Sequence, residues 1–195
     1  MVEVELQDQS WVGIRPIEPG DKEALLAAFH RLSEESRYRR FLAPMKNLSS
    51  SQLAYLTEVD HHDHEAMVAF DLAGGGLVGV GRWVREEDGE RAEAAVTVAD
   101  DWQGRGLGTA LTRLLGGRAV EEGITCFTAL LLADNEDMKG LLEAVGHVEV
   151  TDREGEAIQV LVPLAPEVVK DPSLRSVLRA VAATEGSLAK PPGQP

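Results

Sequence analysis

The sequence predicts a mixed α/β fold built around a central twisted sheet flanked by helices. The chain has 195 residues, which is enough for one main domain with a substantial core. Alternating, strand-like stretches are interleaved with stretches of helical apolar spacing, and one strand runs through a glycine-rich loop into an apolar helix. We expect the main domain at residues 1–165, followed at residues 166–195 by a C-terminal helix and a mobile Pro/Gly-rich tail.

The N-terminal half is expected to hold strands and helices in roughly equal measure. Leu25, Phe29 and Leu32 fall on one face of the first helix, behind a turn at Pro19–Asp21 that supplies its N-cap. Three adjacent glycines, Gly74 to Gly76, suit a hairpin turn because glycine tolerates positive φ. Strands are expected at residues 11–17, 66–72 and 77–85, and helices at residues 22–32, 34–42 and 51–58.

The C-terminal half has the order strand, loop, helix, strand. Leu107, Leu111 and Leu114 recur at helical spacing after the glycine loop, and Gly123 offers a C-terminal stop. Strands are expected at residues 91–99, 126–132, 147–151 and 157–164, the last two as a hairpin, and a short helix at residues 138–145. An amphipathic helix opening at residues 171–173 is expected to precede the tail.

Composition and charge exclude several classes of protein. The formal net charge of -14 opposes binding to the phosphate backbone of nucleic acids. No apolar run approaches the roughly 18 residues of a membrane span, and the acidic N-terminus is not that of a signal peptide. The single cysteine, Cys126, allows no intrachain disulfide and is expected to be a small buried side chain. We therefore expect a cytoplasmic protein with no nucleic-acid or membrane partner.

The stretch QGRGLGTAL, residues 103–111, places three glycines directly before an apolar helix. Glycines there let backbone N–H groups converge on one point, and the helix N-terminus adds about half a positive charge. This predicts an anionic ligand, namely a phosphate. A Walker loop would need a Lys-Ser/Thr pair, and a dinucleotide loop would need Gly or Ala where Thr109 or Leu111 stands. The pattern Gln/Arg-x-x-Gly-x-Gly/Ala of acyl-CoA pyrophosphate loops is matched by Gln103, Gly106 and Gly108.

On these residues the chain resembles the GNAT superfamily of acyl-CoA-dependent N-acyltransferases over residues 11–164. The preceding strand, the following helix, the next strand and Asn135 all stand where that family places them. The segments SEESRYRRFL, VDHHDHEAMVAF and RAEAAVTVADDWQGRGLG look most similar to the catalytic domain of bacterial Pat-type protein lysine acetyltransferases. The resemblance implies the GNAT fold and acetyl-CoA as the acyl donor.

The resemblance also implies a set of cofactor-binding residues. The main chain of one strand would pair with the pantetheine arm, which requires two neighbouring parallel strands to splay apart. The loop would hold the pyrophosphate, and Asn135 would contact the cofactor near its reacting end. The strand residues are Val96, Thr97 and Val98, and the loop residues are Gln103, Gly104, Arg105, Gly106, Leu107, Gly108 and Thr109. Asn135 is equally well explained as a helix cap before Met138.

A general base is expected because a lysine amine with a pKa near 10.4 is almost entirely protonated at neutral pH. Glu93 lies about ten residues before Gln103 on the same strand, and lysine acetyltransferases of the superfamily use a glutamate in a similar Ala-Glu context. A solvated strand carboxylate is the alternative explanation. Many superfamily members have a tyrosine acid where this chain has Leu142, so we assign no acid.

Two charged segments remain. The run HHDHE at residues 61–65 contains possible zinc ligands, but its spacing is too compact for a standard site, so no metal is expected. Residues 37–41, RYRRF, are either a mixed charged helix face or a contact for the acceptor or CoA.

Together these features predict an acetyl-CoA-dependent N-acetyltransferase that transfers its acyl group directly to a primary amine. The preferred acceptor is a lysine of a protein. Two alternatives are a small-molecule amine N-acetyltransferase and a non-catalytic CoA-sensing module. The sequence leaves the oligomeric state open, a homodimer included.

Overall fold

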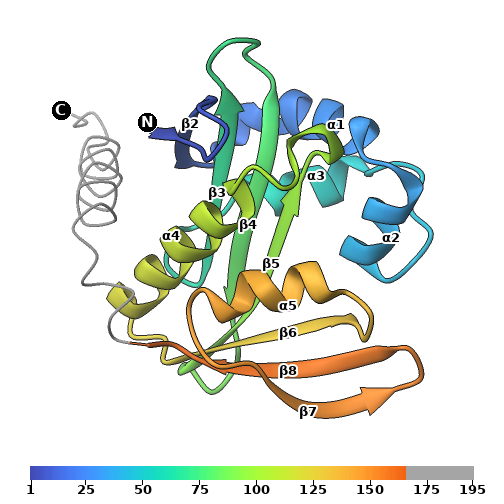
Figure 1. Cartoon of the computed structure of the whole chain (residues 1–195), viewed down its shortest axis with the longest axis vertical. Helices are drawn as coiled ribbons and strands as arrows, with labels where there is room; N and C mark the ends of the chain where they lie inside the picture. Colours follow the sequence, from blue (N-terminus) through green and yellow to red (C-terminus); the bar gives the residue numbers. More distant parts are fainter. Residues whose placement is uncertain (166–195) are drawn as a thin grey trace, which may run out of the picture.

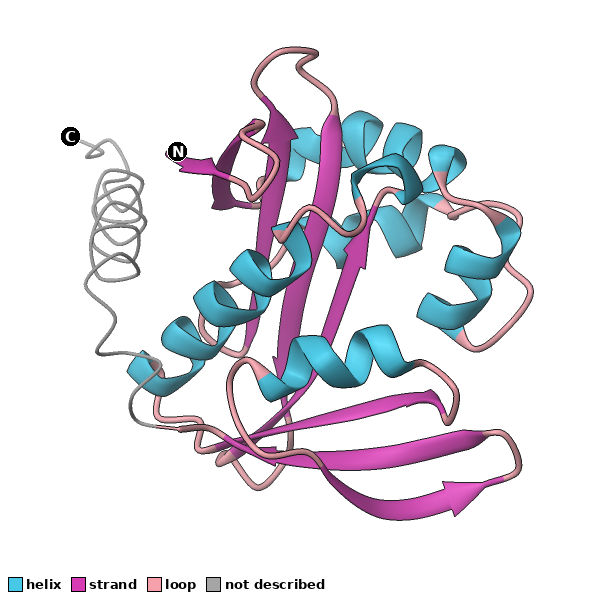
Figure 2. Ribbon diagram, in the orientation of Figure 1, coloured by secondary structure: helices cyan, strands magenta, loops and turns pink. Residues whose placement is uncertain are grey.

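The computed structural model describes residues 1–165, which form one eight-stranded sheet with helices on both faces (Figures 1 and 2). The strand order is β1-β2-β3-β4-β5-β6-β8-β7. Neighbouring strands are antiparallel except β5 and β6, which run parallel. The predicted mixed α/β class is therefore confirmed. The strands are β1 (Val2–Glu5), β2 (Trp11–Pro16), β3 (His64–Asp71), β4 (Leu77–Arg85), β5 (Arg91–Val98), β6 (Cys126–Leu132), β7 (Glu149–Glu154) and β8 (Ala157–Pro163).

The helices divide the core into two apolar clusters. The smaller cluster joins α1 and α3 to the sheet through residues such as Leu25 and Val68, and the larger one joins α4 and α5 to it through residues such as Leu111 and Leu142. Helix α2 lies beside the end of β5 (Figure 1). The helices are α1 (Lys22–Arg31), α2 (Glu34–Phe41), α3 (Ser50–Thr57), α4 (Leu107–Glu121) and α5 (Glu136–Glu143), with 3-10 turns at Pro19–Asp21 and Asp100–Trp102.

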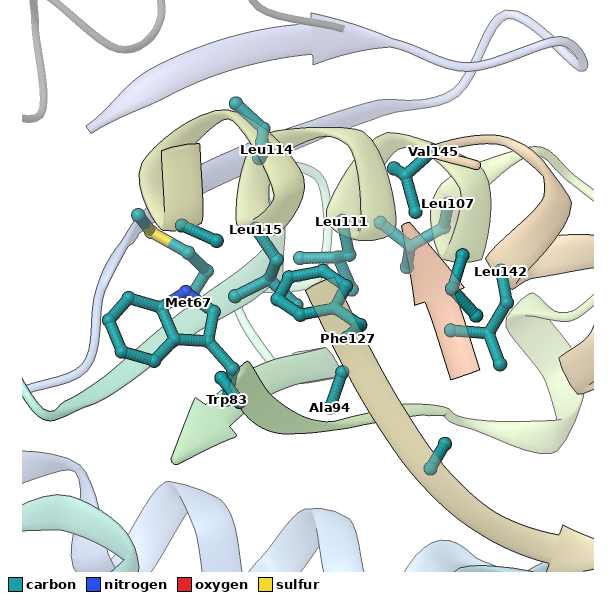
Figure 3. Packing of buried hydrophobic residues seen from close by; sticks show 14 of the residues in the cluster. Met67, Trp83, Ala94, Leu107, Leu111, Leu114, Leu115, Phe127, Leu142 and Val145 are labelled. Atoms are coloured by element: carbon teal, nitrogen blue, oxygen red, sulfur yellow. The ribbon is translucent and has the colours of Figure 1, made fainter. Parts of the chain in front are cut away.

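Glycines on β4 let α4 pack directly onto the sheet. A Cβ atom at Gly81 would lie 2.5 Å from Cδ1 of Leu115, and one at Gly79 would lie 3.0 Å from Cδ1 of Leu111. Figure 3 shows both leucines pointing from α4 toward the sheet, beside Phe127 of β6. Burying each leucine contributes roughly 1.5–3 kcal/mol. This packing fixes the N-terminus of α4 beside β5.

Most predicted elements are present, with differences at their ends. β1 was not predicted from the sequence; it is a four-residue edge strand in which half-buried valines alternate with exposed glutamates. Helix α5 starts two residues earlier than expected because Asn135 caps it. The expected C-terminal helix and tail lie outside the described residues. Within residues 1–165, no helix is long and apolar enough to cross a membrane.

Candidate active site

β5 and β6 pair over only three residues and then separate. Arg91–Glu93 pair with Cys126–Thr128, and the parallel register stops there. β5 stays paired with β4 through Val98, while β6 stays paired with β8 through Leu132. From Ala94 onward, the edge of β5 that faces β6 therefore carries main-chain N–H and C=O groups that have no strand partner in the described sheet.

A cleft of about 780 Å³ occupies this opening. Its walls come from α2, β5, the glycine loop, β6 and the start of α5. It brings together every predicted site residue except Arg105 and Leu107: the lining includes Glu93, Val96, Thr97, Val98, Gln103, Gly104, Gly106, Gly108, Thr109 and Asn135. Residues that are separated by more than 40 positions in the sequence thus face one space.

The glycine loop supplies the N-terminus of α4 to this cleft. Gly104 and Gly106 have φ of 72° and 91°, a region that favours glycine. Gly106 is the N-cap of α4 and offers no side chain to the helix, so the N–H groups of the first turn remain available for a ligand. A Cβ atom at Gly108 would lie 2.9 Å from Leu141, so this glycine lets α5 approach α4. The loop is thus shaped to accept an anion.

Three loop residues have side chains that contact other parts of the protein. The amide of Gln103 donates to the main-chain oxygen of Val98 at 3.2 Å and thereby holds the loop against the end of β5. Arg105 stacks on Trp102 at 4.6 Å and forms an ion pair with Asp8 at 3.1 Å. Leu107 is fully buried in the core under α4. Neither Arg105 nor Leu107 is among the residues that line the cleft.

Glu93 stands where the two strands begin to diverge. Its neighbours Ala92 and Ala94 are buried in the cluster under α4, and strand side chains alternate, so Glu93 faces the opposite side. Its side chain is exposed and lines the cleft. The guanidinium of Arg40, on α2, interacts electrostatically with this carboxylate. A base at this position can reach a group that enters from the side of α2.

Asn135 caps α5 while it lines the cleft. Its Oδ1 accepts the main-chain N–H of Met138 at 3.1 Å, and the residue is buried. The helix-cap explanation is therefore present in the structure, and it does not conflict with a contact from the side-chain NH₂ to a ligand. Leu142 is fully buried against the core, and neither Tyr38 nor Tyr55 is among the residues that line the cleft.

Helix α2 forms a wall of the cleft that the sequence analysis left undecided. Arg39, Arg40 and Phe41 line it. The N-terminus of α2 is tied to the start of the glycine loop, because Asp100 accepts hydrogen bonds from the main-chain N–H of Ser33 at 2.6 Å and from the hydroxyl of Ser36. Burial raises the pKa of Asp100, but these hydrogen bonds outweigh it, so the pKa lies below its ordinary value.

Gln7 is a further lining residue that sequence reasoning missed. Its main-chain N–H donates to the oxygen of Arg105 at 3.1 Å, and its side chain lies 3.2 Å from where a Cβ of Gly106 would stand. No sequence pattern signals this contact, because it depends on β1 and β2 carrying their connecting loop over the glycine loop.

The histidine-rich segment at residues 61–65 forms ion pairs and hydrogen bonds. Glu65 is fully buried, and its two oxygens meet His61 Nδ1 at 2.8 Å and Arg118 Nε at 3.2 Å. Two further contacts are exposed, between His62 and Glu122 and between Asp63 and Arg85. No group of three or more His, Cys, Asp or Glu side chains within residues 1–165 is arranged to hold a metal ion.

Comparison with known proteins identifies the family. The model of the acetyltransferase (GNAT) family matches residues 26–147. Acetyltransferase Pat of Mycolicibacterium smegmatis is 35% identical over 190 residues, which is 92% of this chain and 57% of that protein, so the chain spans little more than half of that relative. Acetyltransferase PA5475 of Pseudomonas aeruginosa is 35% identical over 162 residues, covering 82% of this chain and 87% of that protein.

A solved structure agrees with this assignment. The GNAT domain of S. lividans PAT superposes with a TM-score of 0.76 at 30% identity, covering 84% of this chain and 96% of that one. The predicted GNAT fold is thus confirmed, and the chain belongs to the acetyltransferase (GNAT) family.

Proposed function

We propose that the protein is an acetyl-CoA-dependent N-acetyltransferase that acylates primary amines directly, with protein lysines as the preferred acceptors. One observation carries the proposal: the edge of β5 that has no strand partner beyond Glu93 leads, within one cleft, to the uncapped N-terminus of α4. An extended chain of amides that ends in a pyrophosphate, as in CoA, matches both features.

The donor is held mainly by the main chain in this proposal. Peptide groups of Val96–Val98 hydrogen-bond to the pantetheine amides as an added strand would. The N–H groups of residues 104–109 and the positive end of the α4 dipole hold the pyrophosphate. In this proposal the thioester lies near the point where β5 and β6 diverge, beside Glu93.

Glu93 acts as the general base, directly or through a water molecule. At pH 7 only about one lysine amine in 2,500 is neutral, equivalent to roughly 4.6 kcal/mol, so removing the proton is the step that needs most help. The neutral nitrogen attacks the thioester carbonyl carbon and the C–S bond breaks. The nitrogen then loses its second proton, which passes through water to the departing thiolate, so that CoA leaves as the thiol. A thiol with a pKa near 8.5 needs only about 2 kcal/mol of help at pH 7, so an acid is not required.

The protein-lysine preference rests on the resemblance of two segments, SEESRYRRFL and VDHHDHEAMVAF, to Pat-type lysine acetyltransferases. The first covers α2, which forms a wall of the cleft, and the second leads into β3. The net charge of -14 also favours a cationic acceptor. A small-molecule amine remains the alternative, because the donor site says nothing about the acceptor.

Incubation of the protein with acetyl-CoA and a cell lysate, read by mass spectrometry, tests the proposal. We expect new acetyl-lysines that disappear when the Glu93→Gln variant replaces the wild type. Release of CoA with a polyamine or amino sugar, without any enzyme-dependent acetyl-lysine, would establish the small-amine alternative. Binding of CoA without turnover on any amine would establish the non-catalytic module.

A further inference from the structure

Two arginines line the same small cavity without a carboxylate partner. Arg82, on β4, is 6% exposed, and Arg40, on α2, is half-buried. Within residues 1–165 neither guanidinium has a carboxylate oxygen within 4 Å. The carboxylate that acts on Arg40 from farther away is Glu93.

The groups that do contact Arg82 are neutral. Its Nη1 donates to His64 Nε2 at 3.1 Å and its Nη2 to the main-chain oxygen of Leu56 at 3.2 Å. Burial and Arg82 together lower the pKa of His64 to about 4, so the imidazole is uncharged at neutral pH. Tyr55 covers His64, with the ring centroids 5.1 Å apart. Arg82 thus keeps a buried positive charge whose hydrogen-bond partners are both uncharged.

This arrangement is energetically unfavourable without an anion. Burial and the neighbouring Arg40 lower the pKa of Arg82 to about 9, far below the ordinary value for a guanidinium. Buried charges are normally paired, and removing one partner from a buried pair is strongly destabilising. Two like charges that share one pocket are therefore a place where a bound carboxylate would relieve a cost.

A small cavity beside the cleft is lined by the two arginines and shares Arg40, Ala95 and Thr97 with the cleft lining. It measures about 50 Å³ and has mostly apolar walls. A water molecule needs roughly 10–15 Å³ by this measure, so a carboxylate group fits. Ala95 and Thr97 lie on the same face of β5 as Glu93, because side chains two residues apart on a strand point the same way. Each such step along the strand spans about 7 Å. The distance from a carboxylate bound there to Glu93 would be about the length of a lysine side chain.

We propose that Arg40 and Arg82 form a carboxylate-binding subsite for the acceptor. The acceptor class is then a primary amine with a carboxylate about one lysine side chain away, either the α-carboxylate of an amino acid or an Asp or Glu side chain beside a target lysine. Such an acceptor suits the rest of the surface as well, because the acidic protein attracts the ammonium group while the arginine pair attracts the carboxylate. This inference rests on the proposed function and defines its acceptor.

Matched acceptor pairs test the subsite. Nα-acetyl-lysine is compared with its amide, and a peptide that carries Glu beside the lysine is compared with the same peptide carrying Gln. The wild type should prefer the carboxylate member by about 10- to 100-fold in kcat/KM, the range expected for hydrogen bonds to a charged group. A preference in the first pair alone assigns the α-carboxylate, and one in the second pair assigns the side chain of a protein.

Variants identify the residues responsible. Arg40→Gln should remove most of the preference, mainly through the KM of the acceptor, and leave the KM of acetyl-CoA unchanged. Arg82→Gln should act in the same way if circular dichroism shows it folded, and Arg82→Lys should retain part of the preference. Arg113→Gln, which removes an exposed arginine from α4, is the matched control and should change nothing.

Three outcomes would overturn the inference or its basis. Equal rates for both members of each pair would refute the subsite while leaving acetyl transfer intact. A change confined to the preference for succinyl-CoA over acetyl-CoA in Arg40→Gln would assign the arginines to the acyl group instead. Absence of transfer to any amine would refute the proposed function itself.

Discussion

The two sides of the cleft are made differently. The side formed by β5 and the glycine loop presents main-chain groups: a strand edge that loses its partner after Glu93, and the N-terminus of α4 behind Gly106. The side formed by α2 presents long cationic side chains, Arg39 and Arg40, and Arg40 also lines the small neighbouring cavity that contains Arg82 of β4.

In the account proposed above, the main-chain side binds the acyl donor and the side-chain side selects the acceptor. A main-chain site binds the invariant part of a donor and depends on backbone geometry, so side-chain changes around it have little effect while glycine changes have a large one. A side-chain site reads the individual acceptor and can be altered one residue at a time. Substitutions on the two sides should therefore have effects of different size and kind.

The largest effect is expected from Gly106→Glu, which should reduce the affinity for CoA by at least about 100-fold. The φ of 91° disfavours any other residue, and a carboxylate there would oppose the phosphates at the helix N-terminus. Gly123→Glu introduces the same charge at a similar φ of 79°, in open space at the far end of α4, and should bind CoA normally. Calorimetry that gives equal affinities for both variants would contradict the loop assignment.

Glu93→Gln should lower kcat at pH 7 by about 10² and leave the affinity for acetyl-CoA unchanged. The rate should partly recover as rising pH deprotonates the amine itself. Glu90→Gln, which removes an exposed carboxylate just before β5, serves as the control and should behave like the wild type. A pH–rate profile of Glu93→Gln that overlays the wild type would move the role of base to another group.

A smaller effect is expected on stability at acidic pH, through His64 beside the arginine pair. The pKa of His64 is about 4 in the folded protein and near 6.5 when unfolded, so the unfolded chain binds more protons between these values. Stability should therefore fall as the pH drops from 6.5 toward 4, by about 1–2 kcal/mol after solvent screening. His64→Gln keeps an acceptor for Arg82 and should reduce this fall, whereas the exposed His30→Gln should not. Urea titrations that show the same pH dependence in both variants would contradict the effect.

The smallest effect, none at all, is expected from metal removal. The carboxylates at residues 63 and 65 are engaged by Arg85 and Arg118, which leaves the histidine-rich segment a poor ligand set. Dialysis against a strong chelator should leave CoA release unchanged. Activity that is lost on dialysis and restored by zinc would show that a metal takes part.

The main-chain side of the cleft could be predicted from the sequence, and the side-chain side could not. The glycine loop could be predicted from the sequence because its requirements, positive φ and an open helix N-terminus, are met by residues that are contiguous in the chain. The adjoining strand and helix could be predicted from the periodicity of their apolar residues. β1 was missed because four residues at a sheet edge give too short an alternation to stand out, although Val2 and Val4 do alternate with glutamates.

The acceptor side could not be predicted because its residues meet only in three dimensions. Arg82 looks like an ordinary polar position on a strand, and its burial depends on how α3 and His64 close over β4. Arg40 belongs to a helix with charges on several faces, so the sequence alone could not decide which charge turns inward. Asn135 shows a third limit, since one side chain both caps a helix and lines the cleft.

Amide hydrogen exchange with and without acetyl-CoA tests most directly whether the open edge of β5 and the glycine loop hold the donor. Acetyl-CoA should slow exchange in peptides that cover residues 94–109, because their main-chain N–H groups become hydrogen-bonded to the cofactor. Peptides from the β7–β8 hairpin, which contributes no lining residue to the cleft, should exchange at the same rate in both states. Slowing that is confined to regions outside residues 94–109, with saturating acetyl-CoA bound, would contradict the account.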